Sequence, residues 1–424
     1  MAETQRYDIG SDLHYKKLVS SLGEKENIST RDDIYSESGQ KLVAKGTKIN
    51  NKVAATLLKH KLQLPLDDSV EIENPITPAI IVNDINKLVS NSKTLTKLFS
   101  GISDAESIEN LLSTHSFPST IAFKLSVEKF ERADLYEHSL LVLCLAYFIG
   151  CKAKISAQKL TDTLLASLLH DIGLLHIDPS YFESGKKLNS EERKFLHVHV
   201  IISNLIVSAH SQYQGTISLA VLDHHERLDG SGYPNAKEGE NICIPGQILA
   251  ISEVVASKFD QTHECIKSNE LELLLNMNAK KLNPELYSYF SVLFQGDDFD
   301  SSENSLSESE IKIKLHDLAS ILKTWISLSS KQPSSSTTTQ FIGQYIDTLY
   351  ESLIQAGMNF ESLDFLIMMI EQDDMMKHHT YTILKESAWQ LSNLIEEVKR
   401  RKLYQASLND ASLRIWFKSI DDFI

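Results

Sequence analysis

Histidines that could bind a metal are concentrated in one stretch of this chain. Eight of the fifteen histidines lie between His138 and His225, more than uniform scatter would place there. Histidine is the commonest protein ligand of transition metals, and carboxylates often complete such sites. The concentration therefore indicates a metal centre, and the question becomes which elements bring these side chains together.

The first candidate, His138, lies on an apolar helical stripe. Leu141, Val142 and Leu145 follow it at helical spacing, and Asp134 precedes it by four residues on the same face. A lone histidine in such a stripe is more often an ordinary core residue than a ligand. His138 becomes a candidate metal ligand only in combination with the histidines that follow it.

The pair His170–Asp171 gives a sharper signal. It ends the apolar segment LLASLL, and Gly173 can end the helix just after it. Burying an imidazole beside a carboxylate is costly unless another group pairs with both. A metal ion would satisfy both side chains at once.

The later histidines also follow apolar segments. His199 lies in a helix predicted to start near residue 190, and His197 is about 200° away around that helix, so that at most one of the two faces the core. His224 and His225 end the apolar stretch 217–222, just before the turn-forming residues 229–234. Paired histidines at a helix edge are usually solvated, but their place at the end of a buried segment favours metal ligation.

The elements that must position these residues are predicted to be mainly helical. Residues 1–125 are expected to form a small α+β module, with a hairpin of Ile34–Tyr35 and Lys41–Val43 around a turn at Gly39. Residues 126–296 show helical periodicity, residues 297–310 are an acidic, Ser-rich linker, and residues 311–424 are expected to form a C-terminal helical domain.

Two motifs in the middle segment resemble those of a known family. HDIG at 170–173 and HHERLDGSGYP at 224–234 resemble the HD-GYP family of HD-domain metal-dependent phosphohydrolases, over about residues 126–296. The resemblance implies a helical HD-type bundle around two or three divalent metal ions, iron or manganese. It also implies hydrolysis of cyclic di-GMP to linear pGpG or to GMP, in bacterial second-messenger signalling.

Carried over position by position, the resemblance gives a set of site residues. Asp134 falls on an optional ligand for a third metal, Tyr233 falls on a residue that contacts substrate or shapes the loop, and Gly232 and Asp229 belong to the same substrate-binding loop. His170 and Asp171 are the implied catalytic pair, with Asp171 bridging two metals that hold a hydroxide between them. The implied metal ligands are His138, His170 and Glu253 on one metal, His199, His224 and His225 on the other, and Asp171 on both.

This chain departs from the family pattern at three places. Leu174 replaces a lysine, Glu253 replaces an aspartate, and residues 262–265 lack the arginine and lysine of a phosphate clamp, for which Lys258, His263 or Lys267 would be substitutes. Each lost charge-assisted contact would cost roughly 1.5–3 kcal/mol. Two alternatives therefore stay open: a metal-bound scaffold that binds a protein partner through the GYP loop or the C-terminal helices, and a hydrolase of another phosphate ester.

Composition limits the other classes of function. The formal net charge of −15 makes the chain a poor non-specific binder of nucleic acid polymers. The longest apolar run, 140–151, is shorter than the ~20 residues of a membrane span. No export signal opens the chain, and the four cysteines are expected to be reduced thiols. We expect a cytoplasmic protein that is not associated with a membrane.

Overall fold

The structure is a computed structural model that describes residues 13–103, 105–182, 190–260, 262–294, 306–330, 337–401, 403 and 410–424. It divides the chain into two compact units, Met1–Cys265 and Ile266–Ile424. The boundaries expected at 125 and 296 do not coincide with this division. Of the expected linker 297–310, residues 297–305 lie outside the described residues, and a helix already begins at Glu308.

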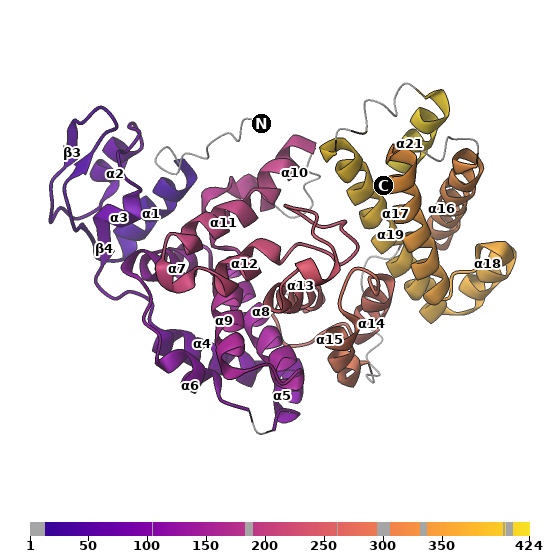
Figure 1. Ribbon diagram of the computed structural model, residues 1–424, viewed down its shortest axis with the longest axis horizontal. Coiled ribbons are helices and arrows are strands. Elements are labelled where there is room, and N and C mark those ends of the chain that lie inside the picture. Colours follow the sequence, from indigo (N-terminus) through magenta and orange to yellow (C-terminus); the bar gives the residue numbers. More distant parts are fainter. Residues whose placement is uncertain are drawn as a thin grey trace. The chain divides into compact units, whose positions relative to one another are not determined.

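The first unit begins with the predicted α+β module, which Figure 1 shows in indigo to purple. Strands β2 and β3 form the predicted antiparallel hairpin, with Ile34 opposite Val43, and β1 pairs with β4. Asn50 caps the following helix by accepting hydrogen bonds from the backbone of Lys52 and Val53. The elements of this module are α1 (Leu13–Lys25), β1 (Ile28–Thr30), β2 (Ile34–Tyr35), β3 (Lys41–Val43), α2 (Asn51–Leu57), α3 (Leu66–Ser69), β4 (Val70–Ile72), α4 (Pro78–Asn91), α5 (Lys93–Ser100) and α6 (Ile108–Ser113).

The rest of the first unit is a helical bundle built around α8 and α9. Gly150 lets these two helices approach closely, because a β-carbon there would lie 2.6 Å from Cδ1 of Leu160. The mainly helical architecture predicted from periodicity is confirmed. The elements are α7 (Ser119–Glu131), α8 (Ala133–Lys152), α9 (Ala157–Leu169), η2 (Ile172–His176), η3 (Pro179–Phe182), α10 (Ser190–His197), α11 (His199–Ser208), η4 (Ser211–Tyr213), α12 (Thr216–Asp223), η5 (Gly239–Asn241) and α13 (Ile244–Ala256).

Helix α8 is more apolar than the run counted from the sequence suggests. Among the described residues it is the one single helix long and apolar enough to cross a membrane, and 78% of its most apolar stretch is buried inside the fold. Residues 338–355 and 360–372 pass the same test only as a pair bent by 67°. A core helix of a bundle meets these criteria as well as a membrane span does.

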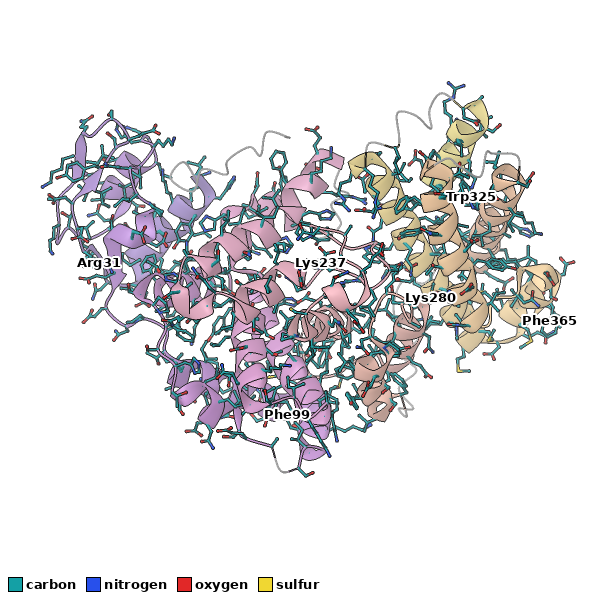
Figure 2. All side chains as sticks on the ribbon, in the orientation of Figure 1. Arg31, Phe99, Lys237, Lys280, Trp325 and Phe365 are labelled. Carbon is teal, nitrogen blue, oxygen red and sulfur yellow. The ribbon has the colours of Figure 1, made fainter. Side chains whose placement is uncertain are left out.

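The second unit is a helical bundle with its own core. Trp325 and Trp416 pack against each other with ring centroids 4.7 Å apart. Figure 2 labels Trp325 within this unit and Phe365 on α18, where Phe365 is exposed while Leu366 and Ile370 of the same helix are buried. The elements are α14 (Ser268–Met277), α15 (Pro284–Ser288), η6 (Tyr289–Leu293), α16 (Glu308–Ser329), α17 (Thr337–Gln355), η7 (Phe360–Ser362), α18 (Leu363–Gln372), α19 (Asp374–Arg400) and α21 (Ala411–Phe423).

Candidate metal centre

Five elements of the first unit bring the predicted ligands to one place. Helix α8 carries His138, the junction of α9 and η2 carries His170 and Asp171, and the first residue of α11 is His199. His224 and His225 directly follow α12, and Glu253 lies on α13. These elements pack against one another throughout the bundle, so the ligands come from segments far apart in sequence but adjacent in space.

Gly173 fixes the distance between the HD motif and α11. A β-carbon at Gly173 would lie only 2.4 Å from the carbonyl oxygen of His199, which no larger residue tolerates without a backbone shift. The amide of Gly173 also donates a hydrogen bond of 2.9 Å to Oγ of Ser203. The glycine therefore holds η2 against α11 and sets the separation of Asp171 from His199.

Asp171 lies between two groups of histidines. Its Oδ1 is 3.1 Å from Nε2 of His199 and 3.7 Å from Nε2 of His224. Its Oδ2 is 3.3 Å from Nε2 of His170 and 4.0 Å from Nε2 of His138. Each carboxylate oxygen thus faces a different set of imidazoles, the arrangement expected of a bridging ligand.

The two groups have the dimensions of metal sites. Within each group, one potential ligand atom per residue lies within 4.8 Å of all the others. Glu253 extends the group of His138 and His170, because its Oε1 is 2.8 Å from Nε2 of His170 and 3.1 Å from Nε2 of His138. The longer side chain therefore reaches the position that the sequence assigned to it. The groups are Asp171, His199, His224 and His225, and His138, His170 and Asp171.

The hydrogen bonds of three imidazoles fit metal ligation. Nδ1 of His170, His199 and His224 lies 2.7, 2.5 and 2.6 Å from a main-chain carbonyl three residues earlier. A carbonyl oxygen only accepts, so each Nδ1 carries the hydrogen and each Nε2 presents a lone pair to the centre. Those three Nε2 atoms are buried and make no hydrogen bond, and the same holds for Oδ1 of Asp171. Divalent cations would satisfy these atoms, so the residues present fit the metals that the family implies.

Charge within the centre divides the histidines into two kinds. Burial alone would lower the pKa of His170, but the negative charges of Asp171 and Glu253 outweigh it and raise this pKa well above its usual range. Burial, reinforced by the positive charge of His170, lowers the pKa of His224 to about 3. Protons and metal ions therefore compete at His170, whereas His224 stays neutral at all ordinary pH values.

Asp134 does not join this cluster. Both of its carboxylate oxygens accept hydrogen bonds of 3.0 Å from Arg132, and 68% of its side chain is exposed. The helical spacing from His138 predicted a shared face. The ion pair with Arg132, at the start of α8, instead directs the carboxylate to the surface.

The three residues assigned to substrate organise the loop that follows α12. The amide of Tyr233 donates to the carbonyl of His225 at 3.1 Å, and the ring of Tyr233 stacks on the ring of His225 with centroids 4.7 Å apart. Gly232 is packed so tightly that a β-carbon would lie 2.4 Å from the Arg227 nitrogen. Asp229 accepts from the amide and hydroxyl of Ser231 at 3.0 and 2.6 Å.

Several residues that the sequence reading missed support the same loop. Arg227 donates to the carbonyls of His224 and Glu226 at 3.3 and 2.8 Å, which satisfies acceptors after the end of α12. Lys237, labelled in Figure 2, donates to Oδ1 of the buried Asp223 at 2.7 Å. The available sequence signal for Lys237 was Asp223, an acidic residue next to the paired histidines at the end of an apolar segment, because a buried carboxylate needs a partner.

Residues 262–265, where the sequence lacks a cationic clamp, form a tight loop. Asp260 accepts hydrogen bonds from the amides of Thr262, Glu264 and Cys265, at 3.1, 3.0 and 3.2 Å. His263 has a φ of 57°. Burial lowers the pKa of His263, with the charges of Glu137 and His138 also acting on it. Leu174, the other departure, is buried in η2.

Comparison with known proteins agrees with this site. The family described as "HD domain" matches residues 125–286. The chain is 32% identical over 120 residues to the cyclic di-GMP phosphodiesterase PdeB of Borreliella burgdorferi, covering 28% of this chain and 31% of that protein. It is 30% identical over 162 residues to the 3'3'-cGAMP-specific phosphodiesterase 1 of Vibrio cholerae, covering 33% and 36%.

A third relative is the cyclic di-GMP phosphodiesterase response regulator RpfG of Xanthomonas campestris pv. campestris, 32% identical over 101 residues, which cover 24% of this chain and 27% of that protein. The chain spans about a third of the length of these curated relatives. The family match at residues 125–286 includes the metal centre. Residues 125–286 thus form an HD domain, and the HDIG and GYP motifs with the geometry around Asp171 are those of the HD-GYP subgroup.

Proposed function

We propose that this protein is a metal-dependent phosphodiesterase that hydrolyses a cyclic dinucleotide, cyclic di-GMP, to linear pGpG or GMP. The observation that carries the proposal is the position of Asp171, whose two oxygens face two separate groups of histidines. Names of relatives that act on cyclic di-GMP or 3'3'-cGAMP support the substrate class.

The centre would hold two divalent ions, iron or manganese in our proposal, because imidazole ligands suit iron and the carboxylates of Asp171 and Glu253 suit manganese. Asp171 would contact both ions, and Glu253 would complete the group of His138 and His170. Bound there, the metals would supply positive charge to a phosphoryl group and would activate water.

The chain's own residues prepare the centre for that chemistry. The carbonyl bonds to His170, His199 and His224 hold their Nε2 atoms toward Asp171. Arg227 fixes the backbone that follows α12. The negative charges of Asp171 and Glu253 offset part of the charge of two bound cations. The ligands are therefore oriented before metal arrives, which lowers the cost of binding.

The test is product analysis with the full chain. Protein loaded anaerobically with iron or manganese is incubated with cyclic di-GMP, with 3'3'-cGAMP and with bis(p-nitrophenyl) phosphate, and products are separated by chromatography. We expect cleavage of the cyclic dinucleotides. Asp171→Asn, which keeps the side-chain shape, should abolish it, whereas Asp134→Asn should not. Hydrolysis of the nitrophenyl ester alone would contradict the proposed substrate.

A second candidate is a metal-bound scaffold with weak or no turnover. Two observations favour it: Leu174 is buried where the family has a lysine, and no arginine or lysine lies among the described residues 262–265. Such a protein would bind a signalling partner through the GYP loop or the C-terminal helices. Full metal content with no product from any of the three substrates would favour the scaffold.

A further inference from the structure

His225 is held differently from the other buried histidines of the centre. His170, His199 and His224 are each oriented by a hydrogen bond from Nδ1 to a main-chain carbonyl. Among the described residues, no such bond is made by the side chain of His225. Its orientation must come from packing.

Aromatic rings supply that packing. Tyr233 stacks on His225 with ring centroids 4.7 Å apart and an angle of 26° between the planes. His224 also lies 4.1 Å from His225 at 46°, and His199 packs edge-on at 5.2 Å. The imidazole therefore packs against one stacked ring and two other ligands.

Tyr233 in turn stacks on a residue that belongs to neither motif. The ring of His197 stacks on Tyr233 with centroids 4.0 Å apart and planes only 11° from parallel. His197, Tyr233 and His225 thus form a continuous stack of three rings, from the last residue of α10 to the metal centre.

His197 and His199 lie where two helices meet, and the backbone of Val198 between them is itself helical. Helix α10 ends at His197 and α11 begins at His199, with Val198 between them. His199 points into the centre, 3.1 Å from Asp171, while His197 supports the loop that covers His225. Of two histidines two residues apart, His199 therefore contacts the centre directly and His197 contacts Tyr233, which stacks on His225.

We infer that His197 is a positioning residue, which acts through Tyr233 to hold the His225 imidazole in its ligating orientation. The inference deepens the proposed function and rests on it, because it concerns the metal group of Asp171, His199, His224 and His225. It assigns to Tyr233 a role for its ring face that does not depend on its hydroxyl.

The experiment is a calorimetric titration of Mn²⁺ into metal-free full-length protein, with thermal unfolding of the same metal-free samples. Wild-type protein should bind two equivalents. His197→Ala and Tyr233→Ala should weaken one of the two by about tenfold or more, the usual effect of lost support for a ligand, and leave the other unchanged. His197→Phe and Tyr233→Phe keep a flat ring and should restore binding.

Phe195→Ala is the matched control, because Phe195 lies on the same helix with an exposed ring. If His197→Ala binds both equivalents as tightly as wild type does, the inference is overturned and the proposed function is not. Equal weakening of both equivalents, together with a lower melting temperature of the metal-free variant, would show a merely structural role and would also overturn it. A folded wild-type protein that binds no Mn²⁺ would instead remove the proposed function on which the inference rests.

Discussion

Oε1 of Glu253 lies 2.8 Å from Nε2 of His170, so that a glutamate from α13 reaches the ligand that ends α9. Helix α13 packs against both α8 and α9, which places the longer side chain within range of His138 as well. The extra methylene relative to the family's aspartate is accommodated in the bundle.

This contact predicts that Glu253→Gln lowers the affinity for one metal ion. The amide removes the negative charge that balances a cation and leaves the side-chain volume unchanged. We expect a loss of about tenfold or more. Metal content after dialysis, measured by mass spectrometry, tests it. Asp134→Asn is the control and should keep full content, since Asp134 pairs with Arg132 at the surface. Equal content in Glu253→Gln and wild type would exclude Glu253 as a ligand.

The sequence predicted the ligands of the centre well where the helical periodicity and the family motif indicated the same residue. His138 is half-buried on α8, next to buried residues at helical spacing, and the HD pair ends a buried helix. The same apolar pattern therefore indicated both the helices and these ligands. Asp134 shares that spacing, yet Arg132 two residues earlier holds it outside. Local charge decided its position, and helical periodicity carries no information on that.

His197 shows a second limit. Helical spacing places His197 and His199 on different faces, so at most one of them was expected to face the core, and His199 is the buried one. Helical spacing carries no information on the stacking of His197 on Tyr233, which lies far along the chain. The division after Cys265 differs from the boundaries expected at 125 and 296, and no change in composition accompanies it.

Metal removal should destabilise the first unit. Chelation leaves the Nε2 atoms of His199 and His224 buried without a hydrogen-bond partner, while a proton takes the place of the metal at His170. A ligand present at a hundred times its dissociation constant stabilises by about 2.7 kcal/mol, which corresponds to about 5–10 °C in Tm for a domain of this size. Differential scanning fluorimetry with EDTA, followed by Mn²⁺ addition, measures the change. Asp171→Asn should show no response, and a wild-type Tm unchanged by verified metal loss would contradict the prediction.

Glu128 predicts a pH dependence of stability. It is fully buried on α7, accepts one hydrogen bond of 3.2 Å from Ser139, and burial raises its pKa to about 8 from 4.5. Between these values the folded protein keeps a proton that the unfolded chain has released. Stability from this group is complete below pH 4.5 and is lost as pH rises through 8, at up to roughly 1.4 kcal/mol per pH unit.

Glu128→Gln keeps the shape and stays neutral, so it should remove this slope. Urea unfolding of EDTA-treated wild type and variant at pH 5, 6, 7 and 8 gives the comparison, and the difference between the two should grow with pH. Parallel curves over that range would mean that Glu128 is already ionised in the folded protein.

The contacts of Lys124 predict how much stability is lost when the link between the N-terminal module and the bundle is removed. Its buried Nζ lies 3.3 Å from Oδ2 of Asp67 on α3, 3.2 Å from Nε2 of His176 at the end of η2, and 4.0 Å from the ring centroid of Tyr15 on α1. One cation thus joins the module to the turn that starts directly after Asp171. Lys124→Met leaves the Asp67 carboxylate buried without its counter-ion, and breaking such a pair costs about 3–5 kcal/mol.

Urea unfolding measures this cost, and Lys129→Met on the same helix is the matched control. Lys129 pairs with Asp84 at 2.5 Å but is more exposed than Lys124, so its loss should cost below about 1 kcal/mol. Adding Asp67→Asn to Lys124→Met should recover part of the lost stability, because the unpaired charge is then gone. If the double variant were as unstable as the sum of the two single variants, the cost would come from lost packing around Tyr15 and not from the buried charge.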